Sequence, residues 1–320
     1  MYASAFLLRV SIISLLPLVF LVLVALAACA AYVSVVNDFT DRADDMASGK
    51  TNRLVGKSSS FIRSVIAFCI LSGLAVAFYW RHDPLLLLLY SASWIAFTLY
   101  SFPPVRLKQR SGLGVLADAC GAHVFPTLLA VAAVYRWTQQ PFDLIWLVSI
   151  GVWSFSFGVR GILWHQLSDL HHDESINLRT FARAHKRESL QRLGNFIVFP
   201  LELAAFAVML LHTRSVVAMT LLGVYAVLNF LRGRLYGWNF CVVEPKPKFH
   251  HIVMHEYYEV FFPLAFILAS SNQYPVDAFV LLAHGLVFPK RWRNTAIETA
   301  LIVRSLWRLG RSKRVPTREP

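Results

Sequence analysis

The chain has 320 residues, of which 57 % are hydrophobic and only 15 % are charged. Soluble domains carry about 25 % charged residues, so this composition excludes an ordinary soluble protein and indicates a chain that lies in lipid. The formal net charge of +13 raises the question of nucleic-acid binding. The basic residues fall in loops on one side of the predicted membrane and not on one face of a domain, so we expect no nucleic acid among the partners.

Long apolar segments follow one another along the chain. A membrane helix needs about 20 apolar residues, and we predict spans near 10–36, 61–80, 85–101, 114–135, 142–164, 195–212, 215–231 and 253–271, with a shorter ninth at 275–288. No stretch alternates over enough residues to suggest a membrane barrel. We therefore predict an all-α integral membrane protein with eight or nine transmembrane helices. Prolines interrupt several spans and are expected to kink them: Pro17, Pro126, Pro200 and Pro263.

The basic residues indicate the orientation of the spans. If the spans alternate, the loops 37–63, 101–113, 166–192 and 232–250 share one side and hold 17 Lys and Arg. The opposite loops contribute Arg81, Arg136 and Arg214. The positive-inside rule places the basic side in the cytoplasm, and we expect a bacterial inner membrane.

The C-terminal tail has a character of its own. Residues 291–320 are basic, and the spacing of their Trp and Arg residues predicts a helix on an anionic lipid surface. We therefore divide the chain into a transmembrane domain, 1–290, and a basic amphipathic tail, 291–320. The lipid bilayer is an expected partner of both.

Acidic residues gather at the end of the first span, at the predicted membrane surface. Asn37, Asp38, Asp41, Asp44 and Asp45 fall within nine positions. If the first helix continues, Asp38, Asp41 and Asp45 stand at i, i+3 and i+7 and share one face, from which Asp44 is excluded. Acidic groups in such a place are costly and indicate a function.

A second acidic pair follows the fifth span. Asp169 and Asp173 stand at i and i+4, again on one helix face and on the same side of the membrane. Carboxylates packed so closely repel one another unless cations lie between them. Mg²⁺ suits oxygen ligands and is held by one or two carboxylates together with substrate phosphates.

Basic residues follow each acidic cluster. Lys50 and Arg53 follow the first, and Arg179 is among those that follow the second. Carboxylates for a metal ion and cations for phosphate oxygens together suit a diphosphate. The membrane location indicates that the rest of this molecule is a lipid.

At this point the motifs resemble those of the UbiA superfamily of membrane prenyltransferases. The N-D-x-x-D-x-x-x-D pattern at residues 37–45 looks like the first motif of that superfamily, and D-x-x-x-D at residues 169–173 looks like its second. Between them, Tyr100–Gly114 is similar to a loop that often carries Tyr, Pro and Lys. The order of motifs and spans fits from residue 10 to about residue 271.

The resemblance implies a helical bundle around a central cavity that opens toward the cytoplasm and sideways into lipid. It implies that Mg²⁺ is bound between a prenyl diphosphate and five catalytic, metal-binding residues: Asp38, Asp41, Asp45, Asp169 and Asp173. It also implies substrate contacts from a second set of residues: Asn37, Lys50, Arg53, Tyr100, Lys108 and Arg179.

The sequence departs from the family pattern in three places. Relatives usually have a whole span before the one that carries the first motif, whereas only 36 residues precede Asn37 here and one helix fits there. Either the start codon is wrongly placed, or the first helix of the family is missing. The spacing from Tyr100 to Lys108 is longer than the YxxxK of some relatives, and two histidines lie between Asp169 and Asp173.

Other polar residues within the spans leave alternatives open. Arg160, in the fifth span, either contacts phosphate or acceptor or forms a structural ion pair, and Glu202 in the sixth span poses a similar question. His165 stands at i−4 from Asp169 and is a candidate to orient it by hydrogen bonding. Both Arg160 and His165 are kept as candidate substrate-binding residues.

The interpretation that the motifs favour is a Mg²⁺-dependent prenyltransferase. It moves a prenyl group from a polyprenyl diphosphate to an aromatic or other lipophilic acceptor and releases pyrophosphate. One alternative is transfer of a phosphoribosyl group onto polyprenyl phosphate, and another is a non-catalytic lipid carrier on the same scaffold. Complete sets of aspartates argue against the carrier, because carriers rarely need five convergent carboxylates.

Overall fold

The structure is a computed structural model that describes residues 1–176, 178–243 and 250–312. It is helical almost throughout, which confirms the predicted all-α membrane class. Within these residues, seven helical segments are long and apolar enough to cross a membrane: Ile13–Thr40, Ser59–Tyr79, Pro84–Ser101, Gly112–Trp137, Leu144–Ser168, Arg187–Thr213 and Val216–Tyr236. The eighth and ninth expected spans form shorter helices, α14 (Phe262–Gln273) and α15 (Ala278–Val287).

The chain divides into two compact units, and each is described by itself. Among the described residues, unit 1 comprises 15–176, 178–212 and 242–243 together with Met1, and unit 2 comprises 2–14, 213–241 and 250–312. The predicted boundary at residue 290 stays a prediction, although one helix, α16 (Pro289–Ser312), covers most of the expected tail.

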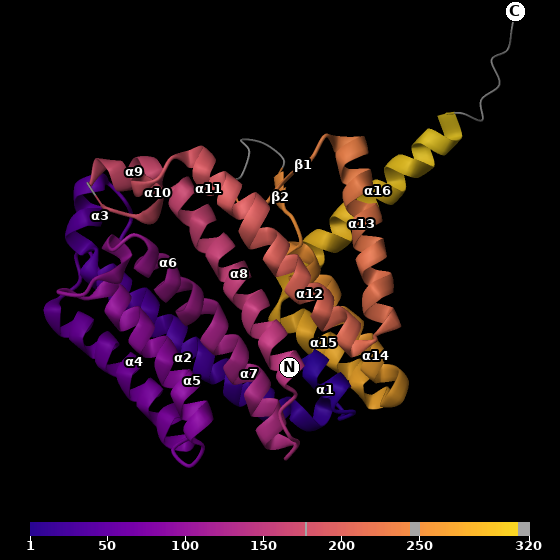
Figure 1. Ribbon diagram of the computed structural model, residues 1–320, viewed down its shortest axis with the longest axis horizontal. Helices are drawn as coiled ribbons and strands as arrows, with labels where there is room; N and C mark the ends of the chain where they lie inside the picture. Colours follow the sequence, from indigo (N-terminus) through magenta and orange to yellow (C-terminus); the bar gives the residue numbers. More distant parts are fainter. Residues whose placement is uncertain (177, 244–249, 313–320) are drawn as a thin grey trace, which may run out of the picture. The chain divides into compact units, whose positions relative to one another are not determined.

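Unit 1 holds both aspartate motifs (Figure 1). Its helices are α2 (Leu16–Thr40), α3 (Arg42–Ser48), α4 (Ser59–Tyr79), α5 (Pro84–Ser101), α6 (Gly112–Ala119), α7 (Phe125–Trp137), α8 (Leu144–Ser168), α9 (Leu170–Ser175), α10 (Phe181–Ala184), α11 (Arg187–Leu193) and α12 (Phe199–Thr213). Helix α2 packs on α4 and α5, α5 packs on α7, and α6 packs on α8. The long helix α2 leads into the first motif, which continues into α3.

Small residues set the approach of α6 to α8. A Cβ atom on Gly158 of α8 would lie 2.9 Å from the Cα atom of Ala119 in α6. Close approach through small residues is a common way for membrane helices to associate, because the lipid gives no hydrophobic drive between them. The pair fixes α8, at whose end the second aspartate motif begins.

Three of the four span prolines follow a wide helical turn. The π-helical turns Cys120–Val124, Gly194–Val198 and Tyr257–Phe261 each lead directly into a helix with proline at its second position. Proline has no N–H and its ring clashes with the preceding turn, so that turn widens and the helix bends. The kinks predicted at Pro126, Pro200 and Pro263 therefore have a definite form in the structure.

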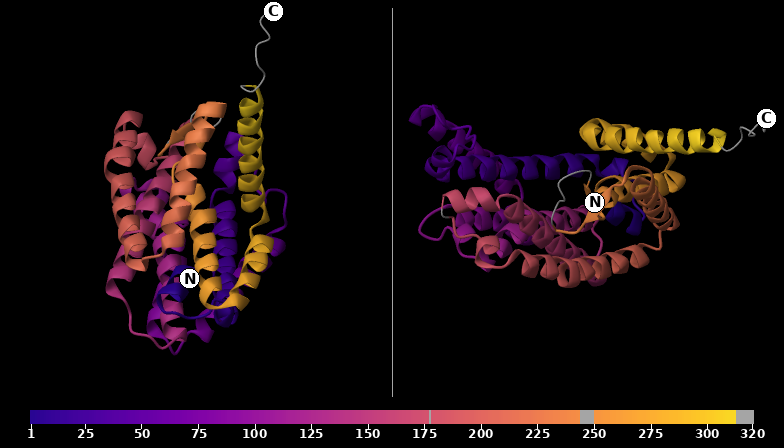
Figure 2. Two further views of the ribbon diagram at one scale, coloured as in Figure 1. Left: turned by 90° about the vertical axis from the view of Figure 1, so that its right-hand side faces the viewer. Right: turned by 90° about the horizontal axis from the view of Figure 1, so that it is seen from above.

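Unit 2 contains α1 (Tyr2–Leu7), α13 (Val216–Tyr236), α14, α15 and α16. A short parallel pair of strands, β1 (Asn239–Cys241) and β2 (His250–Ile252), follows α13. Helix α16 packs against α13 and crosses it at an angle (Figures 1 and 2). The buried carboxylate of Asp277 accepts hydrogen bonds from the backbone N–H groups of Ile12 and Ile13 at 2.9 and 3.0 Å and from the Ser11 hydroxyl at 2.6 Å. This carboxylate ties the N-terminal segment to the start of α15.

Candidate active site

The first motif lies where α2 gives way to α3. Asp41 is the junction residue, with φ −99° and ψ 1°, so the helix does not run through the motif without a break. The helical hydrogen-bond pattern nevertheless persists, because the Asp41 N–H donates to Asn37 O at 2.9 Å and the Asp45 N–H to Asp41 O at 2.8 Å. Helix α3 ends at Gly49, whose φ of +73° lies in the left-handed region that glycine adopts without strain.

The chain after Gly49 folds back onto the motif. Arg53 Nε lies 2.6 Å from Asp38 Oδ2, and this contact raises the pKa of the Arg53 guanidinium further. Asn52 Nδ2 donates to Asp45 Oδ2 at 2.8 Å and to the backbone oxygen of Asp38 at 2.7 Å. The turn at Gly49 therefore supplies cationic and amide donors to two of the predicted aspartates.

The loop after α5 brings two more cations to the same carboxylates. Arg106 Nη2 lies 3.1 Å from Asp41 Oδ1 and 2.9 Å from Asp44 Oδ2, and Lys108 Nζ forms an ion pair with Asp41. Lys108 is buried, and burial lowers its pKa, against the opposing attraction of Asp41. The loop thus inserts a lysine and an arginine among the acidic residues of the first motif.

Arg106 is held in an unusual backbone conformation. Its φ of 37° and ψ of 61° lie in the left-handed region, which costs a residue with a Cβ atom roughly 1–2 kcal/mol. Its Nε atom is buried and, among the described residues, has no hydrogen-bond partner. Strained backbone of this kind gathers at functional sites, where the surrounding structure over-determines it.

The second motif repeats the geometry of the first. Asp169 is the junction between α8 and α9, with φ −92° and ψ 5°, and the Asp173 N–H donates to Asp169 O at 2.9 Å. Asp173 is buried and accepts a hydrogen bond from Thr180 Oγ1 at 3.1 Å. Burial raises the pKa of Asp173; the Thr180 hydrogen bond opposes this, and the neighbouring Asp169 charge adds to it.

The two motifs meet at one end of unit 1. Lys50 Nζ lies 3.4 Å from Asp169 Oδ2, and Ser48 Oγ lies 3.5 Å from His172 Nε2. Figure 1 shows α3, α9 and α10 together at this end. Segments more than 100 residues apart in the sequence therefore form one acidic and basic surface.

Tyr100 and Asn37 lie close to this surface. Ser101 Oγ donates to Asn37 Oδ1, which joins the end of α5 to the first motif. Tyr100 lies one residue earlier, and the charges of Asp118, Asp41 and Asp173 all act on it. Its ring is therefore near carboxylates of both motifs.

Three other candidate residues have different surroundings. Arg160 is buried and forms a two-pronged ion pair with Glu202, with Nε–Oε2 at 2.8 Å and Nη2–Oε1 at 2.7 Å, so the geometry favours the structural alternative. The imidazole of His165 is exposed and lies edge-on to the ring of Trp164. Arg179 is exposed to solvent.

Sequence reasoning missed several residues that contact the aspartates or Asn37. They are Asn52, Ser101, Arg106 and Thr180. Asn52 and Arg106 stand within two residues of the predicted Arg53 and Lys108, so a wider window around each basic loop would have included them. Ser101 and Thr180 carried no signal, because hydroxyl residues are common in helix ends and loops.

The donor set suits a hard divalent cation. The five predicted aspartates offer carboxylate oxygens, which Mg²⁺ prefers. Among the described residues, no three Asp, Glu, His or Cys side chains already converge as a metal cage. Mg²⁺ sites completed by substrate phosphates need only one or two carboxylates, so the residues present fit such an ion.

The fold and this site define an integral membrane protein with paired acidic and basic groups at one end of an apolar helical bundle. Residues 1–239 match the UbiA prenyltransferase family, and the chain belongs to that family. Its members carry out prenyl transfer within membranes, and they are generally metal-dependent. No curated protein matches the chain, and no solved structure does.

Proposed function

We propose that the protein catalyses Mg²⁺-dependent transfer of a prenyl group from a polyprenyl diphosphate to an aromatic or other lipophilic acceptor. The observation that carries this proposal is the meeting of the two motifs through Lys50 and Asp169. Family membership supports prenyl transfer in general. The polyprenyl donor, the kind of acceptor and the metal are our own inferences from the site.

The Lys and Arg side chains at the site form ion pairs with aspartates, and a diphosphate can take the place of those carboxylates. Lys50, Arg53, Arg106 and Lys108 each contact an aspartate of the two motifs. A diphosphate bound there would accept hydrogen bonds from the same nitrogens, and the Arg106 Nε–H offers a further donor. When bound, Mg²⁺ would neutralise charge on the leaving oxygens, with Asp38, Asp41, Asp45, Asp169 and Asp173 as its protein ligands.

The reaction breaks the bond between C1 of the prenyl chain and the diphosphate oxygen. Pyrophosphate leaves with the electron pair, and Lys50, Arg53, Arg106 and Lys108 stabilise the charge that develops on it. The allylic carbon becomes cationic and bonds to the acceptor, which loses a proton. The apolar spans would exclude water, and we propose that the electron-rich ring of Tyr100 steadies the cationic carbon.

We infer that this end of unit 1 faces the cytoplasm of a bacterial cell. The loops that form it hold most of the basic residues between the spans, which supports that orientation. Isoprenoid diphosphates are charged and water-soluble at one end, so a site at a membrane surface can take the head from water and the chain from lipid.

The decisive assay uses membranes that contain the full chain. Labelled prenyl diphosphates of several lengths are supplied with Mg²⁺ or with a chelator, with and without a pool of aromatic acceptors. We expect pyrophosphate release and labelled acceptor only with Mg²⁺. Label transferred from phosphoribosyl diphosphate to polyprenyl phosphate would replace this proposal with sugar-phosphate transfer, and no turnover of either donor would indicate a lipid carrier.

Two substitutions tie the activity to the motifs. Asp38→Asn and Asp169→Asn remove one negative charge from each motif, and we expect turnover to fall at least about 100-fold, because each carboxylate acts on charge in the transition state. The matched control is Glu188→Gln, an exposed acid in the first turn of α11. Full activity in both aspartate variants would overturn the assignment of the site.

A further inference from the structure

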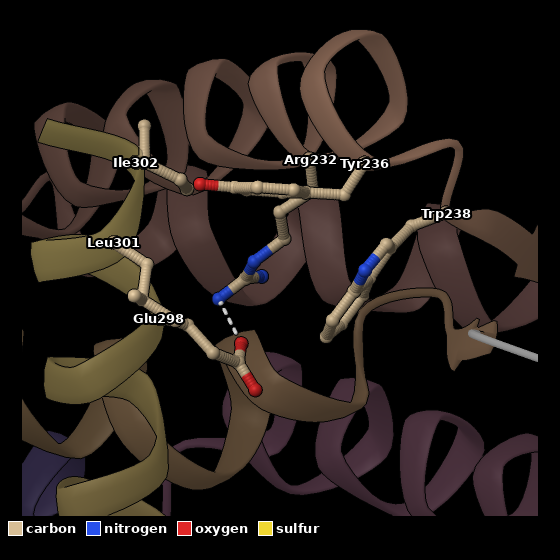
Figure 3. A pocket seen from close by; sticks show the side chains of 6 residues that line it. All are labelled: Arg232, Tyr236, Trp238, Glu298, Leu301 and Ile302. Carbon is tan, nitrogen blue, oxygen red and sulfur yellow. Dashed lines mark ion pairs between the residues drawn. The ribbon is translucent and has the colours of Figure 1, made fainter. Parts of the chain in front are cut away.

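A cavity of about 270 Å³ in unit 2 lies between α13 and α16. Figure 3 shows Arg232 and Tyr236 of α13, with Trp238 just beyond its end, facing Glu298, Leu301 and Ile302 of α16. Helix α13 ends at Gly237, whose φ of +65° reverses the chain and aims Trp238 back at the cavity. The Tyr236 hydroxyl forms a hydrogen bond with Ser305 Oγ at 2.9 Å. Because the hydroxyl is engaged there, Tyr236 lines the cavity with its apolar ring.

The charges around the cavity do not balance. Arg232 is 1 % exposed and pairs with two carboxylates, Glu256 and, at 2.9 Å, Glu298. Glu256 also accepts a hydrogen bond from Thr295 Oγ1 at 2.7 Å. His251 Nε2 lies 3.9 Å from Glu298 and adds charge only when protonated. With His251 neutral, the described groups of this cluster carry one positive and two negative charges.

Glu298 shares its cationic partner, Arg232, with Glu256 and so is not fully neutralised. Burial raises the pKa of Glu298; Arg232 opposes this, and the nearby Glu256 charge adds to it. Its side chain is still 26 % exposed, so a ligand in the cavity can reach it. A second cation beside Glu298 would stabilise its ionised form.

Arg232, in contrast, has one nitrogen in need of a hydrogen-bond acceptor. Its Nε atom is buried and, within the part of the chain that the structure describes, lacks a hydrogen-bond partner. A buried donor without an acceptor costs about 1–3 kcal/mol. A ligand that carries both a cation for Glu298 and an oxygen acceptor for Arg232 would meet both needs.

We propose that this cavity binds the headgroup of a zwitterionic phospholipid with a primary ammonium, of the phosphoethanolamine type. The ammonium pairs with Glu298 beside the rings of Trp238 and Tyr236, and a phosphodiester oxygen accepts from Arg232 Nε. Aromatic faces attract cations, and Trp238 already has the Arg232 guanidinium carbon 5.8 Å from its ring centroid. The cavity lies at the end of the predicted span α13, where headgroups lie in a bilayer.

This chemistry discriminates among headgroups. An anionic glycerol headgroup brings no cation for Glu298 and adds negative charge to a cluster that already has an excess. A trimethylammonium headgroup keeps the attraction to aromatic rings but donates no N–H hydrogen bond to the carboxylate. We therefore expect phosphatidylethanolamine to bind best, phosphatidylcholine less well and phosphatidylglycerol least.

Native mass spectrometry of the detergent-solubilised full chain tests the order. The three lipids are titrated separately, and the lipid-bound fraction is measured for the unmodified protein, Glu298→Gln and Trp238→Leu. We expect phosphatidylethanolamine binding to weaken about tenfold in Glu298→Gln, since a charge-assisted hydrogen bond is lost. We also expect it to weaken in Trp238→Leu. Glu188→Gln makes the same charge change at an exposed residue of unit 1, and this variant is expected to bind as the unmodified protein does.

Three results would overturn the proposal. The first is equal binding of phosphatidylethanolamine and phosphatidylglycerol, and the second is unchanged binding in a folded Glu298→Gln protein. The third is displacement of phosphatidylethanolamine by free ethanolamine at equal concentration, which would make a soluble amine the ligand. Circular dichroism of each variant shows whether it is folded, and prenyl transfer, which resides in unit 1, is measured independently.

Discussion

Arg106 contacts two acidic residues of the first motif and keeps one buried nitrogen without a partner among the described residues. Both features suit a residue whose guanidinium turns to the diphosphate when the donor binds. Arg106→Gln should therefore raise the KM for prenyl diphosphate about 10- to 100-fold, the worth of a charge-assisted contact. Initial rates at varied donor concentration measure this.

The control for this prediction is Arg63→Gln, which removes an exposed cation at the start of α4. It has the same change in net charge and should leave KM unaltered. If Arg106→Gln and Arg63→Gln gave equal KM values, Arg106 would have only a structural role in its loop. The left-handed backbone of Arg106 would then need another explanation.

At the scale of residues, the sequence showed the aspartates but not their partners. The spacing of Asp38, Asp41 and Asp45 follows from helix geometry, which is local and readable. Arg106 reaches Asp41 across 65 positions, and that choice depends on how a loop is placed by tertiary packing. Arg160 shows the same limit, because its partner Glu202 lies on another helix.

Glu298 provides a test of stability against pH. Its pKa in the folded protein is raised above the ordinary value of 4.5, so the folded state binds this proton more tightly than the unfolded chain does. Protonation of Glu298 therefore stabilises the folded protein at low pH, and that contribution is lost as pH rises through the raised pKa. Glu298→Gln lacks this dependence.

The expected result is a difference in unfolding temperature that changes with pH. In lipid-free detergent, the melting temperature of Glu298→Gln minus that of the unmodified protein should increase as the pH rises from 4.5. Thermal unfolding followed by circular dichroism across this range measures it. A difference that stays constant or decreases with rising pH would contradict the raised pKa.

At the scale of elements, the positions of the helices were easier to predict than the points at which they break or widen. Apolar runs identified the spans, because every backbone polar group within lipid must be bonded and a helix does this locally. The runs did not show that α2 and α8 each give way to a short helix at Asp41 and Asp169. The form of the proline kinks was also hidden, since a π-helical turn depends on what packs beside it.

The contact of α4 with α5 depends on one glycine. A Cβ atom on Gly73 would lie 2.4 Å from the ring of Trp94, which itself stacks on Tyr32 with the ring centroids 4.5 Å apart. Gly73→Ala must push this ring pair or separate the helices, and should destabilise the protein by about 1–3 kcal/mol. Thermal unfolding in detergent measures the loss.

Gly223 offers the matched control on another helix. A Cβ atom there would have no heavy atom within 4 Å, apart from its own helix backbone and chain neighbours. Gly223→Ala should be neutral or stabilise by up to about 1 kcal/mol, because alanine is the better helix former. If both alanine variants behaved alike, the Trp94 ring would have room to move and the α4–α5 contact would not depend on Gly73.

At the scale of the whole molecule, composition alone gave the membrane class, and the family match supports it over residues 1–239. Helices α14, α15 and α16 follow the matched region, and α16 contributes Glu298 to the unit 2 cavity, where Arg232 also pairs with Glu256. No sequence motif indicated this cavity, because its residues lie on α13, just beyond its end and on α16, and only packing brings them together. The aspartate site can therefore be predicted from local sequence patterns, whereas the unit 2 cavity cannot.

The orientation of the whole chain can be tested with single cysteines. Ser175, just after the second motif, and Gln140, in the loop between α7 and α8, are both exposed and lie at opposite ends of α8. The natural Cys29, Cys69 and Cys241 are buried, so their background labelling should be low. In bacterial cells that express the protein, an impermeant maleimide should label Gln140→Cys at once and Ser175→Cys only after the membrane is opened. The opposite pattern would place the aspartate motifs outside the cell, away from a cytoplasmic supply of prenyl diphosphate, and would contradict the proposed direction of the active site.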